Sequence, residues 1–225
     1  MASGKKKLLV VLRKVIAVNL LKMNKKEHWE NVFATKNETE VSWFQKKPER
    51  SLDFIENLGI AKDAKIIDIG GGDSYLIDVL LKNGYTNLTL LDISANAIER
   101  IKKRLGTSAE KVTFIVSDIL DFNSIETYDL WHDRASFHFI TEQNQIKAYA
   151  NLVAKAIAKN GKMVIGTFSE NGPKKCSGLD ITQYNENTLK SVFYSDFEVI
   201  DCISEDHLTP FDTIQNFIFC SFKKI

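Results

Sequence analysis

The stretch Ile66-Ile67-Asp68-Ile69-Gly70-Gly71-Gly72-Asp73-Ser74 decides the fold. A β-branched run is followed by three glycines, which permit a tight turn and let a ligand lie against bare backbone. Asp73 or Ser74 can then cap a helix. The stretch therefore predicts strand, turn and helix, with a ligand at the turn. A dinucleotide fingerprint needs a further glycine where Tyr75 stands, which argues against a nicotinamide oxidoreductase.

Short apolar strands and helical stretches alternate from residue 65 to residue 168. β-Branched or leucine-rich runs predict strands over Lys65–Ile69, Leu88–Leu91, Val112–Val116, Tyr128–His132 and Lys162–Phe168. The stretches between them predict helices over Ser74–Lys82, Ala95–Leu105 and Glu142–Lys159. Such alternation is typical of a parallel sheet with helices on both faces.

The C-terminal part breaks this rhythm. Phe197–Ile203 and Ile214–Phe222 both predict strands, and Ser204–Thr213 between them is too short for a crossover helix. These two strands should be antiparallel, because parallel neighbours need a long crossover. We predict an α/β fold with a Rossmann-like, seven-stranded, mostly parallel sheet that ends in an antiparallel pair. The domain covers residues 23–225, and residues 27–60 form a helical N-terminal cap.

Acidic residues stand at the ends of the first three predicted strands. Asp92 ends the second strand, about 20 residues after the glycine turn, where an acid accepts hydrogen bonds from ribose hydroxyls. Asp118 follows the third strand. Both have alternatives: Asp92 can cap the next helix, although Ser94 fills that role better, and Asp118 can be a turn residue. Together with Asp68, these acids predict a ligand site at one edge of the sheet.

The chain resembles the class I S-adenosylmethionine-dependent methyltransferases over roughly residues 28–222. The stretches that match are IIDIGGG, LTLLDIS, FIVSDILDF and NFIFCSF. The resemblance implies that Gly70 and Gly72 underlie the methionine portion of S-adenosylmethionine, with Asp68 near its amino group. Asp92 would take the ribose, and Asp118 the adenine. The implied cofactor-binding residues are Asp68, Gly70, Gly72, Asp92, Ile93, Asp118 and Ile119.

The segment DLWHDRASFHF matches the fourth-strand motif of this family, in the place that faces the methyl group and the acceptor. Methyl transfer is a direct displacement that requires alignment and exclusion of water, without a metal. A general base is required only when the nucleophile arrives protonated. The catalytic candidates are Asp133, Arg134 and His138; His132 and His207 are further candidates for a base. Each histidine can instead be a packing or loop residue.

The acceptor is predicted from a looser similarity to methyltransferases of the thiopurine and tellurite-resistance types, which act on small soft nucleophiles. A small-molecule acceptor, with a thiol first, is therefore expected, and a protein lysine is the alternative. A non-catalytic cofactor-binding protein is a lesser alternative. Trp29, Trp43 and Phe44 either close over the site or pack in the core, and the Gly/Pro-rich segment 171–179 is a candidate lid.

Charge and cysteine content restrict the partners. The eight charged residues before Glu27 are all basic, which leaves 22 basic against 29 acidic residues in the body of the chain. An acidic body argues against a nucleic-acid partner. The three cysteines form no Cys-x-x-Cys pair, so we expect no metal site and no disulfide framework. Cys202 and Cys220 are expected to pack in the core, and a cytoplasmic, reducing location fits best.

Residues 1–22 form a basic extension. Leu8–Leu21 is apolar, but it is interrupted by Arg13 and Lys14 and is too short to span a bilayer, so no stable membrane span is expected. A dispensable extension is the favoured interpretation; a mitochondrial presequence or an interfacial anchor is left open. A chain that starts at Met23 is predicted to fold and to bind the cofactor.

Overall fold

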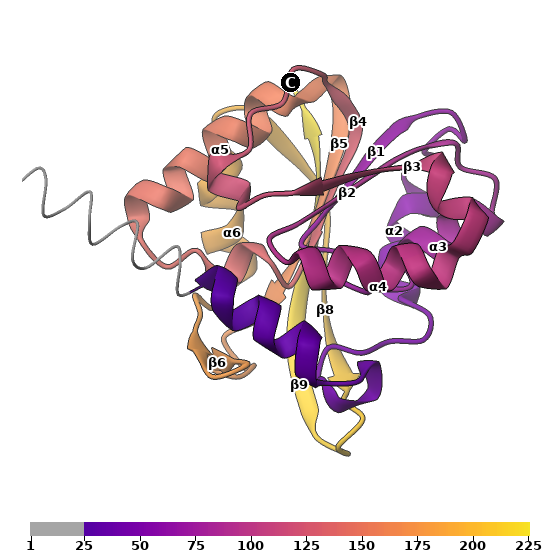
Figure 1. Ribbon diagram of the computed structural model, residues 1–225. Coiled ribbons are helices and arrows are strands. Elements are labelled where there is room, and N and C mark those ends of the chain that lie inside the picture. Colours follow the sequence, from indigo (N-terminus) through magenta and orange to yellow (C-terminus); the bar gives the residue numbers. More distant parts are fainter. Residues whose placement is uncertain (1–24) are drawn as a thin grey trace, which may run out of the picture.

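A computed structural model describes residues 25–225, and the predicted extension of residues 1–22 lies outside them. Its centre is a seven-stranded sheet in the order β3-β2-β1-β4-β5-β9-β8 (Figure 1). The first five strands in chain order are parallel, and β9 is antiparallel to β5 and β8. Their bounds are β1 Lys65–Ile69, β2 Asn87–Asp92, β3 Val112–Val116, β4 Tyr128–Arg134, β5 Ile157–Phe168, β8 Phe197–Leu208 and β9 Ile214–Lys224. The predicted architecture is confirmed.

Helices cover both faces of the sheet, and each face has its own apolar core. On one face α2 (Glu49–Asn57), α3 (Leu76–Lys82) and α4 (Ala95–Leu105) pack against alternate strand residues such as Ile66 and Leu130. On the other face α5 (Gln143–Ala156) and α6 (Glu186–Phe193) pack against their neighbours, such as Ile67 and Trp131 (Figure 1). Because side chains alternate along a strand, consecutive residues of β4 face different layers.

The helical stretch predicted over Glu142–Lys159 was too long. The helix ends at Ala156, and β5 already begins at Ile157, with an irregularity in its pairing to β4 between Tyr128 and Leu130. Asn160 has a positive φ of 63°, which a helix would not allow. The Asn160-Gly161 pair, which lies inside β5, was the local signal against a helix that continues to Lys159.

Half of the predicted loop Ser204–Thr213 is strand. β8 continues to Leu208 and pairs with β9 from Ile214, so only residues 209–213 form the turn. His207, considered as a loop residue, is a buried strand residue that contacts Ser42 and Gln45 instead. Figure 1 shows this hairpin projecting beyond the rest of the sheet.

A disulfide joins Cys202 on β8 to Cys220 on β9, which corrects the expectation that both thiols are free. The two residues are direct cross-strand partners in the hairpin. The spacing of the two cysteines along the chain gave no indication of this contact. The register of the hairpin places them opposite each other. Cys176 is free and buried.

The N-terminal segment and a small hairpin reach the carboxyl edge of the parallel strands. Residues 25–35 are helical, and a short 3-10 turn η1 (Glu38–Glu40) follows. A small hairpin of β6 (Lys175–Cys176) and β7 (Leu179–Asp180) follows β5. The helix and the hairpin lie near one another in Figure 1.

Candidate active site

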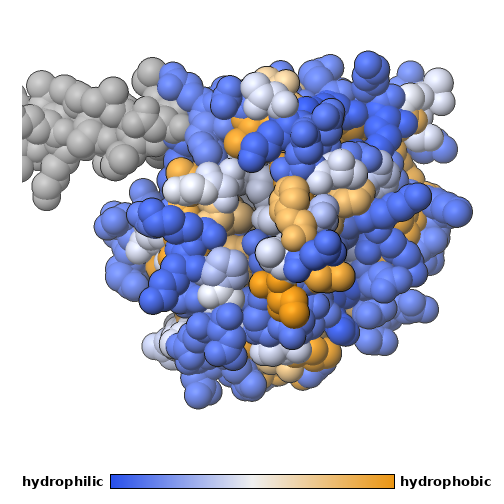
Figure 2. All heavy atoms as spheres, turned by 90° about the horizontal axis from the view of Figure 1, so that it is seen from below, coloured by the Kyte–Doolittle hydropathy of each residue, from blue (hydrophilic) through white to orange (hydrophobic). Residues whose placement is uncertain are grey.

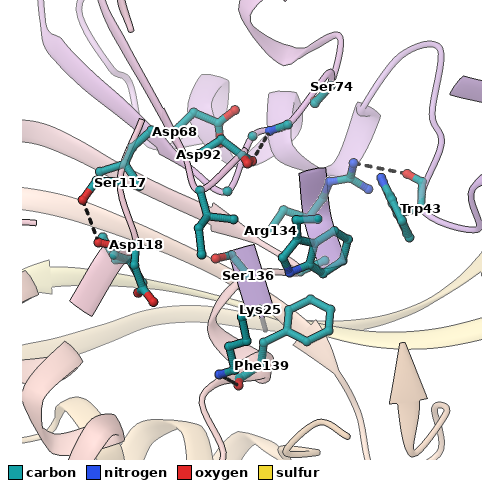
Figure 3. Close-up of a pocket in the computed structure, with 18 of the residues that line it drawn as sticks. Lys25, Trp43, Asp68, Ser74, Asp92, Ser117, Asp118, Arg134, Ser136 and Phe139 are labelled. Carbon is teal, nitrogen blue, oxygen red and sulfur yellow. Dashed lines mark hydrogen bonds between the residues drawn. The ribbon is translucent and has the colours of Figure 1, made fainter. Parts of the chain in front are cut away.

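A cavity opens at the carboxyl ends of β1, β2, β3 and β4 (Figure 3). Its volume, including its open mouth, is about 1070 Å³. All seven predicted cofactor-binding residues line it: Asp68, Gly70, Gly72, Asp92, Ile93, Asp118 and Ile119. They meet because parallel strands present their carboxyl ends at one edge.

Asp68 is held by a buried chain of hydrogen bonds. Its Oδ1 lies 2.7 Å from Nδ1 of His132 on β4, and His132 Nε2 lies 2.9 Å from Ser51 Oγ on α2. All three residues are almost completely buried. Asp68 Oδ2 is buried without a hydrogen-bond partner among the described residues. The carboxylate is thus fixed in orientation and retains a free acceptor at the cavity.

Asp92 shapes the glycine turn from the end of β2. Its Oδ2 accepts a hydrogen bond from the backbone N–H of Gly72, and its Oδ1 accepts one from Ser94, both at 2.8 Å. Burial raises the pKa of Asp92 to about 7, although these two N–H groups oppose the rise. Ser94, and not Asp92, caps α4 by accepting from Ala97 N–H. The expectation for Ser94 is therefore confirmed.

The glycine turn leaves room for a ligand. Gly70 has a φ of 61° and Gly72 a φ of 54°, conformations that side chains rarely adopt. A Cβ atom on Gly70 would lie 2.5 Å from Cβ of Ser136, and one on Gly72 would lie 2.9 Å from the Phe33 ring. Glycine is thus favoured at both positions for two reasons: the positive φ angle, and the short distance to a neighbouring side chain.

Asp118 lies in a short 3-10 turn after β3. Its Oδ1 accepts a hydrogen bond from Leu120 N–H, so the local turn role considered for it is present. It also lines the cavity together with Ile119 and Ser117. In Figure 3, Asp118 and Ser117 lie on the opposite side of the cavity from Arg134 and Trp43.

The catalytic candidates are divided between two faces of β4. Arg134 lines the cavity and donates to Gln45 Oε1 at 2.9 Å and to the carbonyl of Trp43 at 3.3 Å. Asp133 faces the α5 side and does not line the cavity; its carboxylate accepts a 2.6 Å bond from Tyr149 Oη. Burial raises the pKa of Asp133 to about 6. Strand alternation explains the separation of these neighbours.

His138 is also outside the cavity lining. Its ring is completely buried and stacks on Phe168 with 4.7 Å between ring centroids. Its Nδ1 accepts a long 3.4 Å contact from the Phe168 N–H, and burial lowers its pKa to about 3. The residue therefore packs in the core, one of the alternatives considered for it.

Residues 25–44 cover part of the cavity. The sequence had left open whether the aromatic residues of this segment close over the site or pack in the core. Trp29, Phe33 and Trp43 line it, and Trp29 packs edge-on against both Trp43 and Phe139. Phe44 packs against Tyr75 instead. Of the other candidate lid, residues 171–179, only Cys176 lines the cavity.

Hydrogen bonds attach this lid to two sides of the cavity. The Glu30 carboxylate accepts hydrogen bonds from Ser94 Oγ at 2.7 Å and from the first N–H groups of α4. Lys25 Nζ donates to the carbonyl of Phe139 at 3.1 Å. The lid therefore bridges the side of the cavity near β2 and the loop that follows β4.

The sequence profile described as a methyltransferase domain matches residues 60–211. This span contains the glycine turn, Asp92, Asp118 and all of β4. The chain belongs to this methyltransferase family. Membership of a methyltransferase family was predicted from the sequence and is confirmed.

Curated relatives of the methyltransferase fall into two groups. A malonyl-[acyl-carrier protein] O-methyltransferase from Anoxybacillus flavithermus is 34% identical over 107 residues, which cover 47% of this chain and 39% of the relative. An EEF1A lysine methyltransferase 2 from Danio rerio is 24% identical over 159 residues, which cover 64% of this chain and 68% of the relative. The match thus spans about two fifths of the first relative's length.

Solved structures share the fold of the methyltransferase. The N-methyltransferase NodS from Bradyrhizobium japonicum, in complex with S-adenosyl-L-homocysteine, aligns with a TM-score of 0.69 at 16% identity, over 89% of this chain and 98% of NodS. TehB from Haemophilus influenzae aligns with a TM-score of 0.65 at 17% identity, over 88% of this chain and 67% of TehB. These similarities establish the architecture alone.

Within residues 25–225, no three His, Cys, Asp or Glu side chains are grouped so that they could hold a metal ion. The same part of the methyltransferase contains no helix long and apolar enough to cross a bilayer.

Proposed function

We propose that the methyltransferase transfers the methyl group of S-adenosylmethionine to a small-molecule acceptor, with thiols as the first class to test. The observation that carries this proposal is the composition of the cavity next to Ser136 and Phe139. Aromatic rings and two cations, Lys25 and Arg134, line it there. A protein lysine is the alternative acceptor.

The residues of the donor side fit S-adenosylmethionine. The unpartnered Oδ2 of Asp68 suits the amino group of the methionine portion. The turn at Gly70 and Gly72, which has no side chains, leaves the backbone accessible to the rest of that portion. Asp92 would accept the ribose hydroxyls, with Ile93 beside it. Asp118 and Ile119 would contact the adenine. When bound, S-adenosylmethionine supplies a methyl group on a sulfonium, which leaves as the sulfur recovers the bonding electron pair.

Positioning is the main catalytic contribution that we assign to the chain. A lid of Trp29, Phe33 and Trp43 over the cavity would exclude water and align the acceptor, an effect that can supply about 7–11 kcal/mol. Near Arg134 the imidazole of His132 is already engaged through both ring nitrogens. Asp133 and His138, the other predicted candidates, are not among the cavity residues.

A nucleophile that ionises by itself suits such a site. A thiol is partly ionised near neutral pH and is intrinsically nucleophilic, so that no dedicated base is required. A protein lysine arrives as an ammonium ion and would have to lose a proton. Its positive charge would also be repelled by Lys25 and Arg134. The lysine activity in the name of the Danio rerio relative is therefore the less favoured of the two possibilities.

The test incubates S-adenosylmethionine labelled in its methyl group with the full chain and, separately, with small thiols and with cell-lysate proteins. The expected result is label in small products and formation of S-adenosylhomocysteine. An Asp92→Asn variant, which is expected to bind the donor poorly, controls for label that arises without the enzyme. Label only in protein bands would refute the small-molecule acceptor and favour a protein substrate.

A further inference from the structure

Arg134 carries a positive charge whose close partners are all neutral. The guanidinium, half-buried at the end of β4, donates one hydrogen bond to the Gln45 side chain and one to the Trp43 carbonyl. An arginine has five N–H donors, so three remain for a ligand. Among the described residues no carboxylate lies within ion-pair distance of it.

The two acids whose charges act on Arg134 from a longer distance each have another partner. Asp68 and Glu205 both act on Arg134 at longer range and raise its pKa, while burial, the larger effect, lowers it. Asp68 binds His132 at 2.7 Å, and Glu205 binds Arg50 at 2.6 Å. A partly buried cation with only neutral contacts is costly unless a counter-charge completes the site.

Lys25 adds a second cation to the same cavity. Its ammonium group, half-buried in the lid, donates to the carbonyl of Phe139. An ammonium has three donors, and among the described residues its one hydrogen bond is to a neutral oxygen. Lys25 and Arg134 belong to segments far apart in sequence, the lid and β4, so their presence in one cavity is a product of the fold.

The charges in the cavity are separated by sign. Asp92 and Asp118 line it at the end of β2 and after β3, whereas Arg134 and Lys25 line it near Trp43 and Phe139 (Figure 3). Asp68, at the end of β1, is the acid of the cavity that acts on Arg134 at longer range. The acids suit the hydroxyl, amino and sulfonium groups of the donor. On the donor, the single carboxylate is the one group that these cations could bind.

We propose that Arg134 and Lys25 bind an anionic group on the acceptor, so that the enzyme prefers acceptors that carry a carboxylate. This inference rests on the proposed function and names the substrate class of the same cavity. The planar fork of Arg134 suits a carboxylate in two-point contact. The aromatic rings of Trp29, Trp43 and Phe139 would cover the apolar body of the same molecule.

The experiment compares three thiols of similar length that differ in charge: 3-mercaptopropionate, 3-mercapto-1-propanol and 3-aminopropane-1-thiol. Their affinities are measured by calorimetry with the full chain saturated with S-adenosylhomocysteine, so that binding is observed without turnover. We expect the carboxylate to bind at least about tenfold more tightly than the neutral thiol, because a charged hydrogen bond contributes about 1.5 kcal/mol or more. The amine should bind most weakly.

Variants then assign the preference to residues. Arg134→Gln should reduce the carboxylate preference to about twofold or less, and Arg134→Lys should retain part of it. Arg50→Gln is the matched control, since Arg50 already pairs with Glu205 and does not line the cavity. If Arg134→Gln fails to fold, Lys25→Gln on the lid provides a second variant with the same expected direction.

The outcomes separate the two proposals. Equal affinity for the three thiols in the unaltered protein would refute the anion site, whether or not any of them is methylated. A tenfold loss of S-adenosylhomocysteine affinity in Arg134→Gln, with the carboxylate preference intact, would also refute it and assign Arg134 to the donor carboxylate. A clear carboxylate preference without methylation of any thiol would support the anion site and reject only the thiol as nucleophile.

Discussion

Replacing Asp92 by asparagine should separate donor binding from stability. The side chain is 5% exposed and accepts backbone N–H groups of Gly72 and Ser94, both at 2.8 Å. Asparagine has nearly the same shape and retains one of the two oxygen acceptors. It lacks the negative charge, and its NH2 group faces one of the two backbone donors.

The two effects of this change have opposite signs. The rise of the Asp92 pKa from 3.8 to about 7 corresponds to about 4 kcal/mol against the charged form in the folded protein. Asparagine removes that cost, and the loss of one buried hydrogen bond, about 1–3 kcal/mol, offsets it. The free energy of unfolding at pH 8 should therefore be unchanged or higher. Donor affinity should fall about 10- to 150-fold, because a charged hydrogen bond to the ribose contributes about 1.5–3 kcal/mol.

The pH dependence of unfolding provides an independent check. Between about pH 4 and pH 7, a carboxyl whose pKa is raised by folding still holds its proton in the folded protein but has lost it in the unfolded chain. The contribution of this carboxyl to the free energy of unfolding therefore falls as the pH rises through this window and is level above it. Asp133, with a pKa raised to about 6, contributes in the same direction. His138, whose pKa burial lowers to about 3, contributes in the opposite direction. The slope should be smaller in Asp92→Asn than in the unaltered protein.

Urea titrations at several pH values measure the free energy of unfolding. Calorimetry with S-adenosylhomocysteine measures the donor affinity. Asp133→Asn is the matched control, because Asp133 is equally buried but lies outside the cavity lining. Its donor affinity should change by about twofold or less. Unchanged donor affinity in Asp92→Asn would refute the ribose assignment. A large loss of stability at pH 8 would refute the reasoning about its buried charge.

Three further predictions concern the turn, the disulfide and the core. Gly72→Ala should weaken S-adenosylhomocysteine binding about tenfold in calorimetry, because a Cβ at a φ of 54° would approach Phe33 to 2.9 Å; unchanged binding would contradict the close approach. Reduction of the Cys202–Cys220 disulfide, whose partners are 18 residues apart, should cost about 3 kcal/mol and lower Tm by about 6–12 °C. A Cys202→Ser, Cys220→Ser variant should show the same Tm with and without reductant. His138→Ala should lower Tm but reduce the methylation rate less than about a hundredfold, and a loss near ten-thousandfold in a folded variant would assign proton transfer to His138.

Sequence patterns predicted the fold where local chemistry decides it. The bounds of β1, β3 and α4 are those predicted, since a β-branched run or a capped helix carries its own signals. The grouping of the seven donor-side residues followed as well. Each stands at a strand end, and a parallel sheet brings such ends to one edge.

Contacts between distant segments could not be predicted in this way. Ser51 on α2 reaches His132 on β4, and Cys202 faces Cys220 through the register of a hairpin. Nothing in the local sequence marks either pairing. The lid was undecided for the same reason: Trp29 and Trp43 are large apolar residues that suit a core and a ligand cavity equally well.

The most consequential of these points is that consecutive residues of β4 face opposite sides of the sheet. His132, Asp133 and Arg134 are consecutive, and the sequence alone treated all three as neighbours of the reaction. The pairing of Asp68 with His132 and of Ile69 with Asp133 fixes which side each residue faces. A shift of one residue would exchange the faces, and would turn a carboxylate in place of a guanidinium toward Trp43 and the acceptor. The proposed preference for an anionic acceptor therefore depends on the register of β4 against β1, in addition to the identity of its residues.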